Sequence, residues 1–256
     1  MSTDSPTDVA RRAITLLDLT ELGDDDTPDD VTALCRRAVG PHGTVAAVCV
    51  WPRHVSMAVQ LLAGSGVRIA TVVNFPAGDD AIDDVVALTA EALADGADEI
   101  DLVLPYNAFL SGDRSRAEAM IQSVRDAVPA PQRLKVILET GELMSPDTIR
   151  AASETAVRLG ADFIKTSTGK TPRSASLEAT EVMLEVIRDT ARPVGLKPSG
   201  GIRTLDDAAA YLEQADRIMG PGWATPITFR FGASGLLTAL EAAIDGDHDA
   251  TSQEAY

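Results

Sequence analysis

Lysine is scarce in this chain: four lysines stand against eighteen arginines among 256 residues. Three of the four lie in two short segments, Phe163–Lys170 and Val194–Lys197. An arginine stays protonated at any working pH, whereas a lysine whose pKa falls becomes an amine nucleophile that can form a Schiff base. The scarcity excludes lysine as general surface charge, and lysines at the ends of buried strands indicate covalent amine chemistry.

Cysteine and histidine are also rare. Cys35 and Cys49 are the only cysteines and no CxxC pair occurs, which disfavours a disulfide framework and a zinc site. His42, His54 and His248 are scattered along the chain, so no histidine cluster is available to a metal. We therefore predict no metal site and two reduced thiols.

Long apolar runs and excess positive charge are both absent. No apolar run approaches 18 residues, and the acidic N-terminus has no apolar signal region. The net charge of −17 disfavours nucleic acid and anionic membranes as partners, because both need basic patches. We expect a cytoplasmic protein with neither partner, in which a local site must hold any phosphorylated substrate.

Short apolar runs alternate with alanine-rich helical stretches along most of the chain. Runs that are apolar on both faces and are followed by helices fit a parallel sheet covered all round, and eight of them close most naturally into a (β/α)₈ barrel of the α/β class. An open doubly wound sheet is the alternative, disfavoured because no Gly-x-Gly-x-x-Gly follows any run. The predicted strands are Val45–Val50, Arg68–Val73, Glu99–Leu104, Leu134–Leu138, Asp162–Thr166, Val194–Lys197, Arg217–Met219 and Thr228–Phe231.

Additional N-terminal helices precede this alternation. One is expected over Val9–Leu17, and a second follows Thr27, which can cap it with Pro28 in the first turn. No linker is long enough to divide the chain. We predict a single domain over residues 1–256, with residues 1–8 and about 245–256 as flexible tails.

Polar side chains gather where the predicted strands end. In a (β/α)₈ barrel these ends face one shared pocket, and polar groups inside a barrel cost several kcal/mol each if they lack partners. Their accumulation therefore indicates a site. The residues delivered there are Asp18, Cys49, Asn74, Asp101, Glu139, Lys165 and Lys197.

Lys165 and Lys197 are the candidate nucleophiles. Two ammonium groups within about 4–6 Å disfavour each other's charge and burial acts the same way, so one of them could be neutral and attack a carbonyl. The sequence does not say which one, and a lysine paired with an acid remains an alternative for Lys165. Asp101, on the same strand face as Glu99, is either an ion-pair partner or a proton relay through water. The sequence assigns no role to Lys135; a surface position at the start of its strand is the one interpretation it offers.

Two small-residue turns predict a phosphate site. Ser199–Gly201 and Gly232–Gly235 follow predicted strands and open helices, whose N-terminal N–H groups bind anions. Lys170 and Arg203 add positive charge nearby. Each turn alone is more simply a tight turn, but together, in an acidic chain, they favour a phosphate cup.

At this point the segments resemble a known family, the 2-deoxyribose-5-phosphate aldolases. The resemblance runs from about Asp18 to Leu237 and recurs at Tyr256. The segments that carry it are Leu17–Thr20, Ala47–Pro52, Val73–Gly78, Ala97–Asp101, Ile137–Leu143, Phe163–Lys170, Gly195–Arg203 and Arg230–Ser234.

The resemblance implies a class I aldolase on a (β/α)₈ barrel, which cleaves 2-deoxy-D-ribose 5-phosphate reversibly to D-glyceraldehyde 3-phosphate and acetaldehyde. It implies that Lys165 forms the Schiff base, that Lys197 lowers the pKa of Lys165, and that Asp101 assists proton transfer through water. No metal or organic cofactor is implied. Two alternatives stay open, another Schiff-base aldolase for a longer sugar phosphate and a non-catalytic sugar-phosphate sensor.

The resemblance also implies which residues contact the phosphorylated sugar and acetaldehyde. Tyr256 would enter the site to help move the α-proton, and Gly235 departs from a serine expected there. A homo-oligomer, expected as a dimer, is the remaining partner prediction. The implied substrate-binding residues are Asp18, Thr20, Cys49, Thr168, Gly169, Lys170, Gly200, Gly201, Arg203, Gly232, Ser234 and Tyr256.

Overall fold

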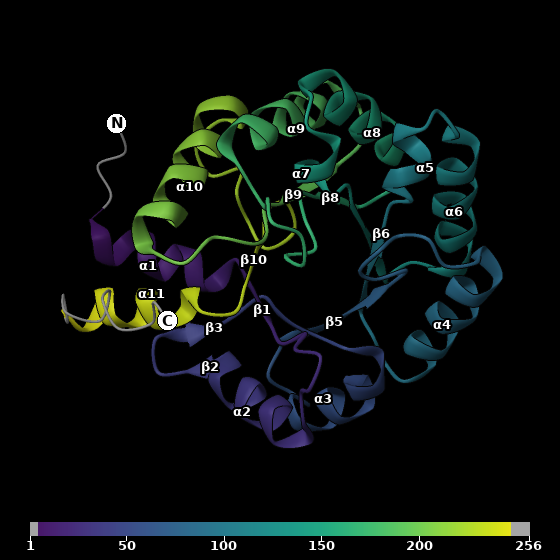
Figure 1. The fold of residues 1–256 in the computed structure, drawn as a ribbon. Helices are drawn as coiled ribbons and strands as arrows, with labels where there is room; N and C mark the ends of the chain where they lie inside the picture. The colour runs from purple at the N-terminus through teal and green to yellow at the C-terminus, as the bar shows by residue number, and fades with distance from the viewer. Residues whose placement is uncertain (1–4, 247–256) are drawn as a thin grey trace.

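Parallel strands form a central barrel, and helices surround it (Figure 1). The computed structural model describes residues 5–246. The chain thus has the predicted (β/α)₈ architecture, with the strands parallel to one another and wrapped by the helices that connect them. The eight barrel strands are β1 (Leu17–Thr20), β4 (Ala47–Val50), β5 (Arg68–Val73), β6 (Glu99–Val103), β7 (Arg133–Ile137), β8 (Phe163–Lys165), β9 (Gly195–Lys197) and β10 (Phe231–Ala233).

The barrel closes between its last two strands. The hydrogen-bonded order runs from β10 through β1, β4, β5, β6, β7 and β8 to β9. Isolated parallel bridges, Leu196 to Phe229 and Ser199 to Gly232, then join β9 to the β10 segment. A short antiparallel hairpin, β2 (Val39–Gly40) and β3 (Gly43–Thr44), lies outside this ring.

Several outer helices begin with side chains that satisfy their first N–H groups. Thr27 caps α2 in a reciprocal capping box with Asp30, and Thr204 with Asp207 does the same for α10. The helices are α1 (Pro6–Thr15), α2 (Pro28–Ala38), α3 (Val55–Leu61), α4 (Ile82–Ala94), α5 (Tyr106–Leu110), α6 (Arg114–Ala127), α7 (Thr140–Leu143), α8 (Pro146–Arg158), α9 (Leu177–Asp189), α10 (Leu205–Met219) and α11 (Leu236–Asp245), with the 3₁₀ turn η1 (Pro52–His54).

Two expectations about individual elements are wrong. The segment Arg217–Met219 is the last turn of α10, which continues to its C-cap Gly220, and is not a strand. The first strand is instead β1, which was not predicted as a strand and whose first residue, Leu17, was expected to be the last residue of a helix over Val9–Leu17. Only Leu16 separates α1 from β1, so no glycine or proline marks the boundary.

The N-terminal part of the barrel differs from the expectation in two further ways. Among the described residues, α1 alone precedes the first strand, because α2 is the crossover from β1 to β4. Helix α1 begins at Pro6, inside the stretch predicted as a tail. The extent of a single domain over residues 1–256 stays a prediction, since residues 1–4 and 247–256 lie outside the described part.

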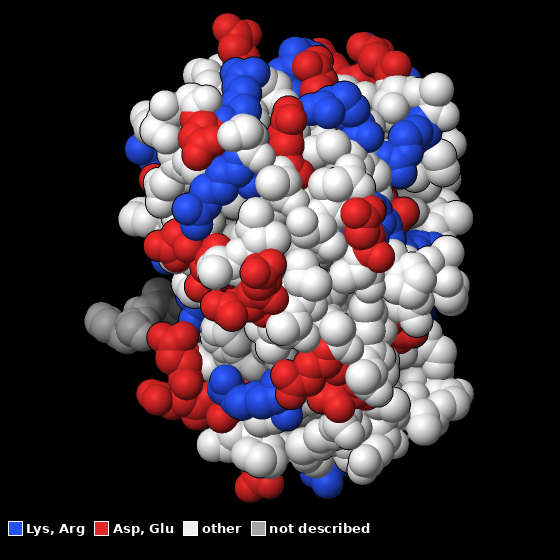
Figure 2. Space-filling model, turned by 90° about the vertical axis from the view of Figure 1, so that its right-hand side faces the viewer, with Lys and Arg blue, Asp and Glu red and all other residues white. Residues whose placement is uncertain are grey.

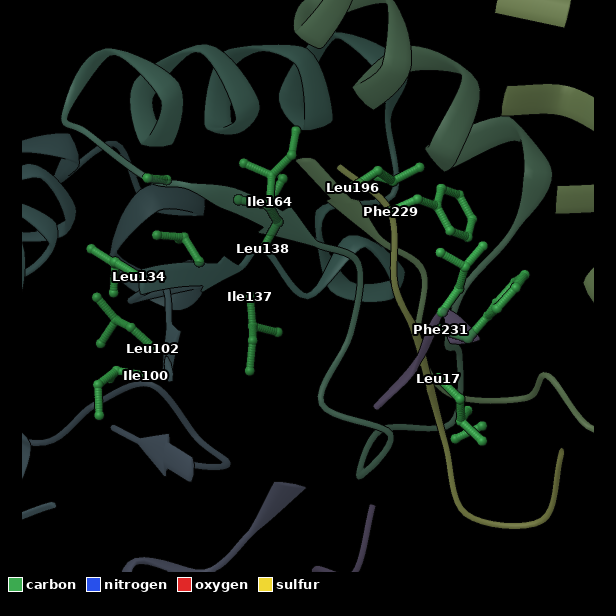
Figure 3. Packing of buried hydrophobic residues seen from close by; sticks show 14 of the residues in the cluster. Leu17, Ile100, Leu102, Leu134, Ile137, Leu138, Ile164, Leu196, Phe229 and Phe231 are labelled. Carbon is green, nitrogen blue, oxygen red and sulfur yellow. The ribbon is translucent and has the colours of Figure 1, made fainter. Parts of the chain in front are cut away.

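Alternation along the strands separates an apolar layer from a charged interior. In β8, Ile164 lies between Phe163 and Lys165, and in β9, Leu196 lies between Gly195 and Lys197. Successive strand residues point to opposite faces, so Ile164 and Leu196 join the core between barrel and helices (Figure 3). The same alternation turns both lysines into the barrel.

An aromatic ring, that of Phe163, fills the barrel interior at the end where the strands begin. Phe163 pairs in register with Gly195, and a methyl group at Gly195 would come within 2.3 Å of the Phe163 ring. Only glycine leaves room for the ring at this position. The Arg230 guanidinium lies 5.6 Å from the ring centroid, so an aromatic–cation layer forms the barrel floor.

The outer surface carries charges of both signs. On the face formed by α4, α5 and α6, acidic and basic side chains are intermingled (Figure 2). Within residues 5–246, no helix combines the length and apolar character needed to cross a membrane.

We expect Ile164→Ala to lower the free energy of unfolding by about 2–5 kcal/mol, because it removes buried methyl groups and leaves a cavity. Ile227→Ala is the matched control: Ile227 is 61% exposed, so its loss should change stability by no more than about 0.5 kcal/mol. Urea unfolding measures both. Equal losses of stability in the two variants would contradict the burial of Ile164 between the barrel and the helices.

Candidate active site

Three lysines converge on the carboxylate of Asp101 in β6. Lys135 Nζ donates to Oδ1 at 2.5 Å, while Lys165 Nζ and Lys197 Nζ donate to Oδ2 at 2.8 and 2.9 Å. The strand register explains the meeting, because Asp101 lies beside Lys135 on the next strand and Lys165 lies beside Lys197. All four residues are buried. Asp101 is thus the common counter-ion of three ammonium groups.

Two further carboxylates and an arginine complete this buried network. Asp18 in β1 lies 2.6 Å from Lys197 Nζ, and Glu99 in β6 lies 2.7 Å from Lys135 Nζ. Arg230 bridges these two acids from below, with N–O distances of 2.5 Å to Asp18 and 2.9 Å to Glu99. Each charge therefore has a partner of opposite sign, which a water-free interior requires.

The buried part of the network holds one more cation than it holds carboxylates, and the partly exposed Arg68 also lies 3.8 Å from Glu99. Four basic groups, the three lysines and Arg230, face the acids Asp18, Glu99 and Asp101. Loss of one proton would balance the buried charge. Lys165 is the group for which this is easiest, because Asp101 is its one carboxylate partner within salt-bridge distance among the described residues.

The lysine pKa values move in opposite directions. Burial, reinforced by the charge of Lys197, lowers the pKa of Lys165. Burial also opposes the charge of Lys197, but attraction to Asp101 and Asp18 outweighs it and raises the pKa of Lys197. The structure thus separates two lysines that the sequence left equivalent: Lys165 is the amine nearer to neutrality, and Lys197 remains an ammonium ion.

Asp101 stays ionised under these conditions. Its burial favours the protonated acid, but Lys135, Lys165 and Lys197 together hold the pKa of Asp101 well below its usual range. A carboxylate held in this way is a fixed negative charge beside the Lys165 amine. It can stabilise a cation that forms there.

Lys165 lies at the base of an open pocket of about 420 Å³. The loops after β1, β8, β9 and β10 form its walls, as expected for the C-terminal end of a barrel. Most residues named in the sequence reading line it: Thr20, Lys165, Thr168, Gly169, Lys170, Gly200, Gly201, Arg203, Gly232 and Ser234.

The remaining predicted site residues do not line this pocket. Asp18, Asp101 and Lys197 are fully buried within the network beneath it. Cys49 is also fully buried, in a small apolar cluster with Leu22, and burial raises the pKa of its thiol. Tyr256 lies outside the described residues.

Two polar contacts in the pocket wall involve the loop after β1. The hydroxyl of Ser234 donates to the Thr20 carbonyl at 2.8 Å, and Lys170 Nζ lies 2.8 Å from Asp24. Trp51 Nε1 donates to the Gly23 carbonyl and anchors the same loop. The ammonium group of Lys170, which is predicted to contact the substrate, is thus already paired with the Asp24 carboxylate.

The interpretation of Lys135 as a surface residue is wrong. It is completely buried, and attraction to Asp101 and Glu99 raises its pKa against the effect of burial. Arg230 was likewise missed as a structural charge. The available signal was strand alternation: Arg230 stands between Phe229 and Phe231, which both face the core, so its own side chain points inward.

The chain matches the model of the DeoC/LacD family aldolase over residues 12–241. This match covers the whole barrel and the site just described. The chain therefore belongs to the DeoC/LacD family of aldolases.

Individual relatives agree with this assignment. A deoxyribose-phosphate aldolase of Agrobacterium fabrum is 51% identical over 257 residues, covering 100% of this chain and 99% of the relative. The crystal structure of a Coccidioides immitis protein, provisionally named a deoxyribose-phosphate aldolase, is 31% identical with a TM-score of 0.81, over 91% of this chain and 85% of that chain. The tetrameric deoxyribose phosphate aldolase of Aeropyrum pernix is 25% identical with a TM-score of 0.73, over 93% and 92%.

Lys135→Met tests the buried network. It should lower the free energy of unfolding at pH 7 by about 3–5 kcal/mol, because it leaves buried carboxylates without a cation. Asp101 and Glu99 have lowered pKa values, so their stabilising effect is present above about pH 4–5 and is lost as pH falls through those folded values.

In the Lys135→Met variant the carboxylate pKa values rise, so the difference from the parent protein should narrow as pH falls below about 4. Urea unfolding at several pH values measures this. A difference that stays constant with pH would show that Lys135 acts through packing alone.

Proposed function

We propose that this chain catalyses the reversible aldol cleavage of 2-deoxy-D-ribose 5-phosphate to D-glyceraldehyde 3-phosphate and acetaldehyde. One observation carries the chemistry: a buried lysine with a lowered pKa, Lys165, lies at the base of a polar pocket. Membership of the aldolase family and the 51% identical deoxyribose-phosphate aldolase support the choice of substrate.

Lys165 is the proposed nucleophile. Its neutral amine attacks the aldehyde carbon of the open-chain sugar, and loss of water from the carbinolamine gives an iminium ion. The iminium accepts the electron pair when the bond between the sugar's second and third carbons breaks, as a base removes the proton of the third carbon's hydroxyl. Glyceraldehyde 3-phosphate leaves, the enamine is protonated, and water returns to release acetaldehyde and the amine. The covalent lysine performs the electron-sink role in this scheme.

The ionised network around Lys165 is proposed to tune these steps. Lys197, held protonated by Asp101 and Asp18, favours the neutral amine of Lys165 through charge repulsion. Asp101 remains a counter-ion when the positive iminium replaces the amine. A water beside Asp101 is the proposed carrier of protons during carbinolamine formation and dehydration.

The pocket wall is proposed to hold the hydroxyl and phosphate groups. The turns at Gly169 and Gly200–Gly201, together with the start of α11 at Gly235, present backbone N–H groups that suit an anion. Lys170 and Arg203 add formal positive charge at the rim. Self-association as a dimer stays a prediction.

The experiment that tests the reaction is borohydride reduction in the presence of acetaldehyde, followed by peptide mapping. We expect an ethyl group on Lys165, because only an imine formed there is trapped. Lys165→Arg should abolish both labelling and cleavage of deoxyribose 5-phosphate, since a guanidinium keeps the charge but forms no imine. A label on Lys197 or Lys135, or cleavage that survives in the arginine variant, would refute the assignment.

Asp24→Asn tests the competition for Lys170. The substrate phosphate must compete with Asp24 for this ammonium group, so removing the charge should lower the KM for deoxyribose 5-phosphate by about two- to fivefold at low salt. The KM for unphosphorylated deoxyribose should not change.

Asp25→Asn is the matched control, because Asp25 is the exposed neighbour and its loss removes the same formal charge. If both variants lower the KM equally, the effect is one of general surface charge. In that case the Asp24–Lys170 pair has no special part in binding.

A further inference from the structure

Glu139 is a buried acid that the proposed reaction does not use. It lies two residues after the end of β7, is 0% exposed, and has φ 56° and ψ 60°, a left-handed conformation that is unfavourable for most residues other than glycine. Burial raises the pKa of its carboxyl group. A strained, buried acid persists only where its surroundings hold it in place.

The Glu139 carboxylate binds the loop that follows β8. Its Oε2 accepts the hydroxyl of Thr168 at 2.5 Å and the backbone N–H of Thr168 at 3.2 Å. Its Oε1 lies 3.2 Å from the hydroxyl of Thr171, whose one proton is shared between this carboxylate and the Arg173 carbonyl at 3.0 Å. One carboxylate thus holds the loop on both sides of Gly169 and Lys170, which line the pocket.

The segment around Glu139 packs tightly against the same loop. The N–H of Thr140 donates to the Thr166 carbonyl at 2.9 Å. A methyl group at Gly141 would come within 2.3 Å of the Arg173 carbonyl oxygen, so only glycine permits this approach. The backbone of residues 139–141 is therefore fixed against both ends of the loop, and the left-handed turn aims the carboxylate at its centre.

We propose that Glu139 is a positioning residue, whose carboxylate clamps the Thr168–Thr171 loop and thereby holds Gly169 and Lys170 in place for the phosphorylated part of the substrate. This inference rests on the proposed function for the identity of that substrate. The clamp itself concerns only the loop and is testable without turnover.

The amine of Lys165 makes no hydrogen bond or ion pair with Glu139 among the described residues, although its charge acts on the Glu139 carboxyl group. It lies against Asp101 in the network below, and the strand of Lys165 is fixed by the β7 and β9 ladders. Loss of the Glu139 carboxylate should therefore weaken sugar binding, whereas the reaction with the two-carbon aldehyde should stay almost unchanged. A general loss of structure would affect both.

The first experiment measures amide hydrogen exchange in Glu139→Gln, which keeps the side-chain length but removes the negative charge. We expect amides of Thr168–Thr171 to exchange about tenfold faster or more, with the strand amides unchanged. Thr171→Val, which removes a partner that does not line the pocket, should give a smaller change in the same direction, and Thr171→Ser should restore the parent rate.

The second experiment separates sugar binding from aldehyde chemistry. Glu139→Gln should raise the KM for deoxyribose 5-phosphate by about tenfold or more, because the loop that meets the phosphate is loosened. Exchange of the acetaldehyde methyl protons with deuterated water, which needs an imine at Lys165 and a proton carrier but no phosphorylated sugar, should stay within about twofold of the parent rate.

Asn74 supplies a matched control. It also ends a strand in the left-handed region, with φ 55°, and its side chain holds a loop through the Val103 carbonyl and the Asp80 N–H. Asn74→Ala should lower stability without changing loop exchange at residues 168–171.

Unchanged loop exchange in Glu139→Gln overturns the clamp, whatever the enzyme's activity. Faster loop exchange with an unchanged KM overturns the link to substrate. Equal losses in acetaldehyde exchange and sugar cleavage would reduce Glu139 to a general structural residue. If the parent protein exchanges acetaldehyde protons but does not cleave deoxyribose 5-phosphate, the proposed substrate fails, while the exchange experiment still decides the clamp.

Discussion

The carboxylate of Asp101 accepts hydrogen bonds from three lysine ammonium groups, and the charge states inside the barrel depend on these three bonds. In water such a cluster would gain little, because each charge would be solvated. Inside a closed barrel the ions must satisfy one another, and the cost of a missing partner is high. The excess of one cation then favours the loss of one proton from the network. Lys165 loses its proton most easily, because it has the fewest carboxylate contacts.

The same network gives its three lysines different roles, although their side chains are chemically identical. Lys135 and Lys197 each contact at least two carboxylates, which raises their pKa values and makes them permanent charges. Lys165 differs only by position, at the upper edge of the network where the pocket begins. Neighbouring strands therefore give chemically identical side chains different charge states: Lys165, the proposed nucleophile, has a lowered pKa, and the lysines around it have raised pKa values.

Much of this could be predicted from the sequence, and the omissions have physical reasons. Lys165 and Lys197 were recognisable because each ends an apolar run before a glycine-rich turn. Lys135 was misread although Leu134 and Val136 on either side of it lie in the core, so alternation turns Lys135 inward. That it meets Asp101 depends on the register between two strands, which local sequence does not encode. The contact of Glu139 with Thr168 spans 29 residues and depends on a left-handed backbone at Glu139. Nothing about a glutamate in the sequence predicts that conformation.

The aromatic layer at the lower end of the barrel has a consequence for traffic through the site. Phe163 lies across Gly195, and Arg230 lies against its ring beneath Glu99 and Asp18. Packed side chains therefore occupy the barrel at Phe163, while Lys165, two residues further along the same strand, lines the pocket of about 420 Å³. In the proposed reaction, the water released when the imine forms and the water that hydrolyses it exchange through the same pocket as the sugar, so a substrate that fills the pocket also governs when water can reach Lys165.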